Sequence, residues 1–384
     1  MKNNSRSILS NILISFVIFL FFIFILEIVL RTTHLFGARI SWSEPDQIVG
    51  WRFVPNSKFW LYKENDHPVT EKINSYGWRD KERALVKPPN TYRIAVLGDS
   101  MVESFQVESN RTFLELTECE LKKNNRLSVE VMNFGQSEFT QTEEFLVLKN
   151  HVEKFSPDMV IVFFQPFNDI RDVNKETAAV HLHPFYTISE NGELLLDTNF
   201  VKTREFKNKC LISKFKLHSI IISLIAERYA FYKDMKAIQK NNDAKTPTSK
   251  GYLSLCTSTP DAIYERNYQL NKTLIKAMVD RCRGKGIRFM LITVDTCVYI
   301  PEIEERYKSM NPSFNANYFE DDLKDFAESL KIDYIGLQRL FRQEYENTKA
   351  PLHWAHWNYE GHKLVADILS KKLKTILSPG NDNY

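Results

Sequence analysis

The chain has 384 residues, of which 43% are hydrophobic and 13% aromatic, so it can form a sizeable core and is not disordered throughout. Its 51 Lys and Arg and 48 Asp and Glu residues give a net charge of +3, spread thinly along the chain. This excludes the dense basic surface of a nucleic-acid-binding protein, and no nucleic acid is expected as a partner. The five cysteines form no CxxC pair, so they predict neither a disulfide framework nor a zinc site.

Near the N-terminus, residues 12–30 form an apolar run whose only polar members are Ser15 and Glu27. A helix of this length, at about 1.5 Å per residue, roughly spans the hydrocarbon core of a bilayer. A cleaved signal peptide would have an apolar region of about 7–15 residues followed by a small-x-small site. A buried helix of a soluble protein would need a core on every side. We therefore predict an uncleaved transmembrane anchor within residues 1–35.

The charges that flank this run give a weak signal of orientation. Lys2 and Arg6 precede it, while Arg31 and Arg39 follow it, so the positive-inside rule gives nearly a tie. We expect the short N-terminal tail inside the cell and the large domain outside the cytoplasm.

Residues 36–91 carry aromatic side chains among Pro, Asn and Gly, which predicts a lead-in segment of short strands and turns. From residue 92 the pattern alternates between strands and helices. The predicted strands are Arg93–Leu97, Val129–Asn133, Met159–Phe164, Ile287–Val294 and a short one near Tyr334. The predicted helices are Thr112–Lys123, Gln141–Lys154, Asn267–Arg283, Phe319–Leu330 and Tyr359–Ile376. Nearly continuous apolar strands that alternate with helices predict an α/β domain, residues 92–384, whose parallel sheet is covered on both faces.

Between about residues 172 and 261 this alternation breaks, which predicts an insertion in the domain. Asn191-Gly192 lies between two alternating runs and predicts a β-hairpin. A basic stretch from Lys202 to Lys216 follows and runs into apolar residues at helical spacing between Leu217 and Ile225. The helix either packs on its own domain or rests on a membrane surface, which basic flanks and an apolar face would suit. The polar residues Asn241–Lys250 predict a loop.

Functional groups in open α/β sheets gather beyond the carboxyl ends of the strands. The residues directly after each predicted strand are therefore the candidates for a functional site. These segments are Gly98-Asp99-Ser100, Asn133 to Ser137, Gln165 to Asp169, Asp295-Thr296 and, before the last helix, "HWAHWNYEGH" with His353, His356 and His362.

Acyl transfer needs an activated nucleophile and preorganised donors for an oxyanion, and these segments can supply both. Ser100 is the candidate nucleophile and His356 the candidate base. The candidate donors are the backbone N–H groups of Ser100 and Gly135 and the side-chain amide of Asn168. A glycine at position 135 lets the backbone approach a substrate closely.

Ser100, Gly135, Asn168 and His356, in this order, resemble the four blocks of the SGNH, or GDSL, hydrolases. "GWRFVPN", "NSYGWRD" and "TYRIAVLGDS" resemble segments of the bacterial membrane-anchored proteins of that superfamily, and the likeness covers about residues 50–373. The resemblance implies a flavodoxin-like three-layer α/β/α sandwich. It also implies ester hydrolysis or acyl transfer, often of an O-acetyl group on a carbohydrate, with no metal or other cofactor.

One departure from the family concerns the acid of the triad. The family usually places an aspartate two or three residues before its histidine, where this chain has Trp354 and His353. Disabling that acid in a triad costs about 10⁴ in rate. Three explanations remain open: a Ser-His dyad with a backbone carbonyl as orienter, another carboxylate such as Asp295, Asp333 or Glu360, or a site that has lost hydrolysis and kept binding.

Two further residues are candidates for contact with substrate. Gln136 can form hydrogen bonds with a polar substrate, and Trp354 can stack on a sugar. The three histidines at positions 353, 356 and 362 match no zinc-ligand spacing, so no metal site is predicted from them.

The sequence thus predicts a membrane-anchored serine esterase or O-acyltransferase in the bacterial cytoplasmic membrane, with its main domain in the periplasm. Its substrate would be an acyl ester, above all acetyl, of a cell-envelope carbohydrate or lipid-linked saccharide, because tethering raises the local concentration of surface substrates. The alternative is a catalytically degenerate protein of the same fold that binds glycans or assists envelope assembly, with envelope proteins as partners.

Overall fold

The computed structural model describes residues 2–33, 35, 41–61, 64, 68–124, 128–241, 254–257 and 260–378. The chain divides into two compact units, one of Met1–Pro45 with Arg204–Lys245 and one of Asp46–Thr203 with Thr246–Tyr384. This division differs from the predicted domain limits at residues 35 and 91. The lead-in segment from Asp46 belongs to the α/β unit, and the middle of the predicted insertion belongs with the N-terminal helix.

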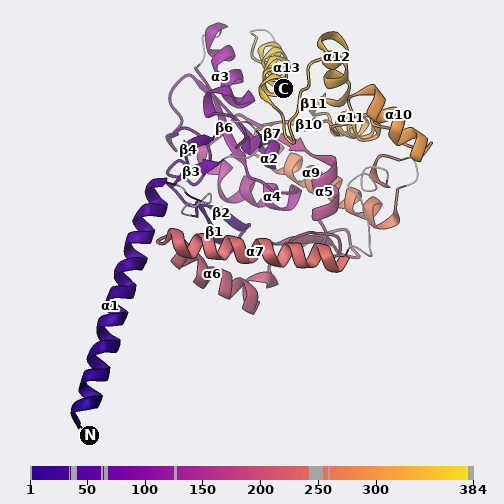
Figure 1. Cartoon of the computed structure of the whole chain (residues 1–384). Coiled ribbons are helices and arrows are strands. Elements are labelled where there is room, and N and C mark those ends of the chain that lie inside the picture. Colours follow the sequence, from indigo (N-terminus) through magenta and orange to yellow (C-terminus); the bar gives the residue numbers. More distant parts are fainter. Residues whose placement is uncertain are drawn as a thin grey trace. The chain divides into compact units, whose positions relative to one another are not determined.

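The larger unit is built on a five-stranded sheet in the order β11-β10-β7-β5-β6 (Figure 1). All four neighbouring pairs of strands are parallel. Counted along the chain, the order is 2-1-3-4-5, which is the flavodoxin-like order. The predicted fold class and all five predicted strands are therefore confirmed. The strands are β5 (Thr91–Gly98), β6 (Ser128–Gly135), β7 (Met159–Phe164), β10 (Arg288–Thr293) and β11 (Asp333–Gly336).

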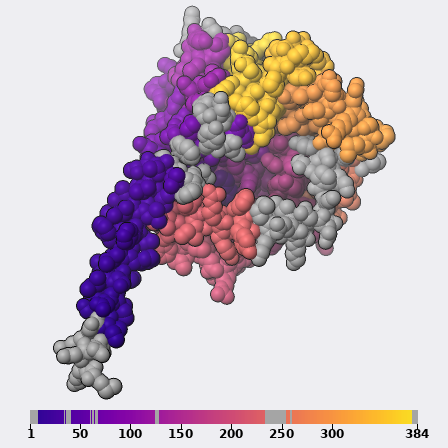
Figure 2. All heavy atoms as spheres, in the orientation of Figure 1, coloured from indigo at the N-terminus to yellow at the C-terminus, as the bar shows by residue number. Residues whose placement is uncertain are grey.

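Helices cover both faces of this sheet, because alternate strand residues point to opposite sides. In β5, Ala95 and Leu97 belong to one hydrophobic cluster, and Ile94 and Val96 belong to the other. The first cluster includes residues of α4 (Gln141–Asn150), α9 (Ala262–Arg283) and α11 (Tyr318–Leu330). The second includes residues of α3 (Phe113–Asn124), α12 (Gln338–Thr348) and α13 (Tyr359–Leu377). Helices α3 and α13 lie side by side on the surface (Figure 2).

Helix ends near the site are fixed by side chains that bind the free backbone N–H groups. Thr140 and Glu143 form a capping box at the start of α4, and Asn358 accepts from the N–H groups of Glu360 and Gly361 at the start of α13. Helix α4 ends at Asn150, earlier than predicted, and a 3₁₀ turn follows at Val152–Phe155. The periodicity did not predict α5 (Pro166–Asp172), α10 (Pro301–Met310) or α12.

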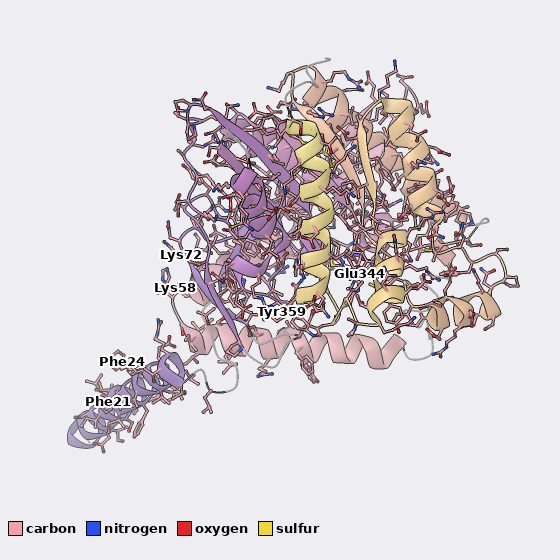
Figure 3. All side chains as sticks on the ribbon, turned by 90° about the horizontal axis from the view of Figure 1, so that it is seen from above. Phe21, Phe24, Lys58, Lys72, Glu344 and Tyr359 are labelled. Carbon is pink, nitrogen blue, oxygen red and sulfur yellow. The ribbon has the colours of Figure 1, made fainter. Side chains whose placement is uncertain are left out.

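Short strands form the lead-in segment, as predicted. They are β1 (Ser43–Asp46), β2 (Gly50–Phe53), β3 (Lys58–Leu61) and β4 (Val69–Lys72). Strands β3 and β4 pair antiparallel, and Lys58 lies opposite Lys72 in their register (Figure 3).

The predicted hairpin is confirmed by the antiparallel strands β8 (Phe185–Ile188) and β9 (Leu194–Asp197). Gly192 in its turn has φ +80°, a conformation that glycine adopts without strain.

The smaller unit contains α1 (Lys2–Thr33), α6 (Arg204–Lys216) and α7 (Ile220–Asn241). Ile8–Thr33 of α1 contains an 18-residue window with a mean hydropathy of 3.1 and is long and apolar enough to cross a membrane. The predicted single helix after the basic stretch is wrong in detail, because the basic stretch forms α6 and a new helix begins at Ile220. Residue 241 ends α7, and the rest of the loop predicted at Asn241–Lys250 lies outside the described residues.

Candidate active site

The candidate nucleophile lies where β5 turns into the short helix α2 (Ser100–Glu103). Asp99 caps this helix by accepting a hydrogen bond from the Met101 N–H at 2.9 Å. A Cβ atom at Gly98 would lie 2.4 Å from Val102 Cγ2, so only glycine lets α2 turn back over the strand. The Gly-Asp-Ser triplet thus supplies a close approach, a helix cap and a serine at the carboxyl end of β5. Strands β6 and β7 flank β5 there, at the switch point where doubly wound folds bind ligands.

Ser100, His356 and Glu64 form a hydrogen-bonded chain. His356 Nε2 lies 2.8 Å from Ser100 Oγ, and His356 Nδ1 lies 2.6 Å from Glu64 Oε1. The other carboxylate oxygen of Glu64 accepts from the His356 backbone N–H at 2.8 Å. Because an ionised carboxylate only accepts, Nδ1 carries the shared proton and Nε2 is left to accept the proton of the Ser100 hydroxyl. This is the orientation that a Ser-His-acid triad requires.

The expected sources of an orienting acid are thereby corrected. Asp295 accepts from Trp357 Nε1 and from the Cys297 N–H, both at 3.0 Å, and lies 3.4 Å from His353 Nε2. Asp295 therefore fixes the Trp357 indole, and its hydrogen bonds go to Trp357 and Cys297, not to His356.

The other two predicted acids are placed elsewhere as well. Asp333 pairs with Arg288 at 2.7 Å and with Lys372 at 2.9 Å at the start of β11. Glu360 is exposed in the first turn of α13. A dyad oriented by a backbone carbonyl is not observed either, because Nδ1 faces the Glu64 carboxylate.

Sequence reasoning missed Glu64 because it lies 292 residues before its partner histidine, in the lead-in segment. The search for an acid was restricted to strand ends and to the neighbourhood of His356. No periodicity or turn chemistry distinguishes Glu64 from Glu71 or Glu82 in the same segment. Only the folded chain brings it to the site.

Asn168 lies on α5 next to the nucleophile. Its Nδ2 donates to Asp99 Oδ2 at 2.9 Å, which uses one amide hydrogen and leaves the second for a ligand. Gln165 caps α5 by accepting from the N–H groups of Phe167 and Asn168, so the position of Asn168 is fixed from two sides. The Ser100 N–H is among the first amides of α2, which have no carbonyl partner within the helix.

Gly135 is placed near α2, but its predicted role as a donor is not supported by its contacts. Its N–H donates to Asn133 Oδ1 at 2.8 Å and is therefore engaged within its own strand. A Cβ atom at this position would lie 2.6 Å from the Glu103 backbone nitrogen and from Val102 Cβ. Glycine at 135 is required for the close packing of α2 on β6, which holds Ser100 in place.

Three acids near the candidate nucleophile are buried: Asp99, Glu144 and Asp169. Burial raises the pKa of each carboxyl, and the neighbouring acids raise the pKa values of Glu144 and Asp169 further. Asp169 Oδ2 accepts from the Gln165 N–H at 2.7 Å and from Gln141 Nε2 at 3.2 Å. The raised pKa values favour the neutral forms of these carboxyls, and the hydrogen bonds of Asp169 fix the start of α5, the helix that carries Asn168.

The lead-in segment also holds the C-terminal end of α2, the helix that begins with Ser100. Arg79 is buried and donates to the carbonyl oxygens of Glu103 at 2.9 Å and Val107 at 2.5 Å. Burial lowers the pKa of its guanidinium to about 10, which leaves it charged at neutral pH. Lead-in residues therefore both orient the histidine and hold the C-terminal end of α2.

Gln136 does not have the predicted role of a substrate contact. It is fully buried, and its Nε2 donates to the Trp51 carbonyl at 2.7 Å, so it fixes the lead-in strand β2. Trp354 does have an accessible ring, with 37% of the residue exposed. Its N–H donates to the His356 carbonyl, and its ring packs edge-on against Tyr359, which Figure 3 labels at the start of α13. An aromatic surface thus adjoins His356.

Among the described residues, Asp295, Cys297 and His353 have ligand atoms within 4.8 Å of one another and could hold a metal ion. Asp295 already accepts two hydrogen bonds, from Trp357 and Cys297, so its oxygens are largely engaged.

A surface cavity of about 890 Å³ lies at the opposite edge of the sheet, lined by Lys87, Asp158 and Arg288 at the amino ends of the strands. The site chemistry does not involve it.

The Ser100–His356–Glu64 chain, on a flavodoxin-like sheet, has the arrangement of a serine hydrolase. No model of a protein family matches the chain, and no curated protein matches it. Among solved structures, an acetyl xylan esterase is similar over 73% of this chain and 99% of its own, at 12% identity and a TM-score of 0.41. A putative lipolytic protein of the G-D-S-L family from Desulfitobacterium hafniense is similar over 73% of this chain and 98% of its own. Its sequence identity is 12% and its TM-score is 0.37. These values assign neither a fold nor an activity to this chain.

Proposed function

We propose that the protein is a membrane-anchored serine esterase or O-acyltransferase of the SGNH type. The observation that carries the proposal is the hydrogen-bonded chain from Glu64 through His356 to Ser100, with Asn168 beside it. The alternative of a degenerate binding protein was motivated by the missing aspartate. Glu64 lies 2.6 Å from His356 Nδ1, and an acid within hydrogen-bonding distance of this ring supports the enzyme over the binding protein.

In the proposed reaction, Ser100 Oγ attacks the acyl carbonyl while its proton passes to His356 Nε2. The carbonyl oxygen becomes an oxyanion that accepts from the Ser100 N–H and the free amide hydrogen of Asn168. The ester bond breaks as Nε2 returns the proton to the leaving alcohol, and an acyl-enzyme remains. Water or a second hydroxyl then attacks this ester with its proton passing to Nε2. Collapse of the second intermediate releases the acid or the new ester, and Ser100 regains its proton.

Glu64 contributes by fixing the tautomer of His356 and by stabilising the imidazolium that forms in each half-reaction. The side chain of Glu64 is only 9% exposed, so its interaction with the ring is less screened than one in water. The geometry is the same for hydrolysis and for transfer, and the acceptor that reaches the acyl-enzyme decides between them.

The substrate is proposed to be an acylated, above all acetylated, carbohydrate of the cell envelope or a lipid-linked saccharide. Exposed Trp354 beside His356 supports a sugar, since aromatic rings offer a flat apolar surface with nearby polar groups. Tyr359 next to it donates to Glu108 at 2.9 Å, and Arg111 lies over its ring at 3.3 Å. Glu108 and Arg111 thus lie next to the Tyr359 ring, and carboxylate and guanidinium groups can bind the hydroxyls of a saccharide.

Trp354→Ala is expected to raise KM for an acetylated oligosaccharide about tenfold, the loss of one stacking contact of about 1.4 kcal/mol. kcat/KM for p-nitrophenyl acetate, which has no sugar, should stay within about twofold. Trp354→Phe is the matched control and should retain most of the affinity. An equal loss on both substrates would contradict a role in sugar binding and indicate a disturbed His356.

Localisation in a bacterial cytoplasmic membrane, with the larger unit in the periplasm, is part of the same proposal. It is supported by α1, whose apolar window has no residue buried in the protein. Envelope proteins that bring the substrate to the membrane remain predicted partners.

The direct test is activity-based labelling of the detergent-purified chain. A fluorophosphonate probe is expected to label the native protein, and mass spectrometry should locate the label on the peptide that contains Ser100. Heat-denatured protein is the control, because an unactivated serine does not react. Turnover of p-nitrophenyl acetate, followed by assay with and without an acceptor sugar, separates hydrolysis from transfer. A folded protein that is neither labelled nor active would overturn the proposal in favour of a glycan-binding protein.

A further inference from the structure

Helices α6 and α7 of the smaller unit expose a set of large apolar side chains. We propose that this α6–α7 pair lies in the headgroup region of an anionic phospholipid bilayer, beside the end of the membrane-spanning helix α1. The inference rests on the proposed anchoring of α1 in a membrane, and it goes beyond it by assigning a membrane contact to a segment about 180 residues further along the chain.

The apolar side chains of α7 form a stripe. Ile222, Ile225, Tyr229 and Tyr232 are spaced by three, four and three residues, which places them on one side of a helix. They are 37%, 64%, 65% and 53% exposed, respectively. Tyrosine is enriched at the boundary between hydrocarbon and water, where its ring is apolar and its hydroxyl wet. The stripe is therefore suited to the interface of a bilayer.

Helix α6 combines a similar stripe with positive charge. Leu211, Ile212 and Phe215 are 57%, 48% and 55% exposed. The helix contains five basic residues and one acidic residue, Glu205, a net charge of +4. Lys207 and Lys214 lie beside the stripe by helical spacing, so their alkyl stems can cover apolar surface while their ammonium groups reach lipid phosphates. Charge and apolar surface together match an anionic lipid surface.

Helix α7 begins next to the C-terminal end of α1, which is also where the apolar run of α1 ends. Glu27 accepts from the N–H groups of Ile220 at 2.8 Å and Ile221 at 3.1 Å and from the Ser219 hydroxyl at 3.0 Å. An acid that caps a helix start in this way satisfies its free amides and its positive dipole end. Glu27 lies three residues before Leu30, the last residue of the apolar run, so the contact fixes α7 near one surface of the bilayer that α1 would span.

Two further contacts strengthen this junction. Arg31 pairs with Glu27 at 2.8 Å and donates to the His218 carbonyl at 2.8 Å. Leu30 is buried against Ile220 and their neighbours Ile221 and Leu224. Helix α7 runs across the direction of α1 and not along it (Figure 1), as a helix lying in the plane of the interface would. Phe21 and Phe24, which Figure 3 labels on α1, have exposed side chains.

A protein partner is the other conceivable occupant of such a surface, since large exposed apolar patches mark interaction sites in general. Lipid is favoured because the patch is continuous with α1 through the Glu27 junction and because its flanks are basic. A protein partner is therefore kept as an outcome of the test.

The test measures the depth of single fluorescent labels in the full chain, reconstituted in nanodiscs with and without phosphatidylglycerol. Nitrobenzoxadiazole is attached to Ile225→Cys or Leu211→Cys in a background with Cys119, Cys210 and Cys297 changed to serine. Phe21→Cys marks the bilayer interior, and Glu346→Cys on α12 marks an aqueous position. Quenching by lipids with a nitroxide near the headgroup is then compared among the labels at 225, 211 and 346, and the label at 21 is tested with lipids that carry the nitroxide on the acyl chain.

Labels at 225 and 211 are expected to be quenched at least about threefold more than the label at 346, and more strongly with phosphatidylglycerol than with phosphatidylcholine alone. If they behave like the label at 346 while the label at 21 is quenched, the proposal is overturned and a protein partner becomes the better explanation. If the label at 21 is also unquenched, the anchoring of α1 itself fails. Equal quenching in both lipids would overturn the assignment to anionic lipid.

Discussion

Replacing Glu64 by glutamine is expected to lower kcat for ester hydrolysis by about 10³–10⁴-fold. Glutamine has nearly the same shape and can still accept from the His356 backbone N–H, so the fold should be retained. Its amide group carries no charge to stabilise the imidazolium, and its NH₂ can donate to Nδ1, which would place the ring proton on Nε2. His356 would then be unable to take the proton of Ser100, to which it lies at 2.8 Å.

The measurement is steady-state hydrolysis of p-nitrophenyl acetate, with KM and the melting temperature determined for each variant. Glu360→Gln is the matched control, because Glu360 is only four residues from His356 in sequence but is exposed in the first turn of α13. It should keep the wild-type kcat. Glu64→Asp should fall between the two, since the carboxylate remains but is shorter by one methylene. A wild-type kcat in Glu64→Gln would show that His356 is oriented by another group.

Ser100→Ala is expected to lower kcat by about 10⁶-fold, the loss found when the nucleophile of a serine hydrolase is removed. The same variant should lose all labelling by a fluorophosphonate. Members of a triad act as a unit, so their losses are not additive. The double variant Ser100→Ala/Glu64→Gln should therefore be no slower than Ser100→Ala alone.

Ser109→Ala is a suitable control, because Ser109 lies in the 3₁₀ turn Ser109–Arg111, away from the hydrogen bonds of the triad. Retention of turnover or labelling in Ser100→Ala would place the nucleophile at another residue. An additive loss in the double variant would mean that Glu64 acts on a step that does not pass through Ser100.

The sheet could be predicted from the sequence because its strands are buried on both faces and therefore read as nearly continuous apolar runs. Met159–Phe164 was predicted with its observed bounds, and each of its residues is buried. The polar segments that follow the strands then had to meet at one edge, which places Ser100 and Asn168 together. His356 was found because it precedes the last helix, where its ring reaches the same edge.

The remainder of the site depends on contacts between residues far apart in sequence. Glu64 reaches His356 from a segment of short strands that has no strong pattern, and no local rule assigns its side chain a partner. The amide of Gly135 is taken by Asn133, a local hydrogen bond that competes with the predicted role. Glu27 reads as an interruption of an apolar run, and only the fold shows that it caps α7. These are cases in which one side chain selects among several available partners.

The position of Glu64 in the lead-in segment has a consequence for how the protein can be divided. The stretch of chain that leads from the membrane helix to the first sheet strand is also the stretch that supplies the acid and, through Arg79, supports the nucleophile helix. A protein trimmed to begin at β5 would retain the sheet, Ser100 and His356, yet it would lack two groups on which they depend. A shortened form of the protein must therefore begin before residue 64 if it is to keep the acid that binds His356.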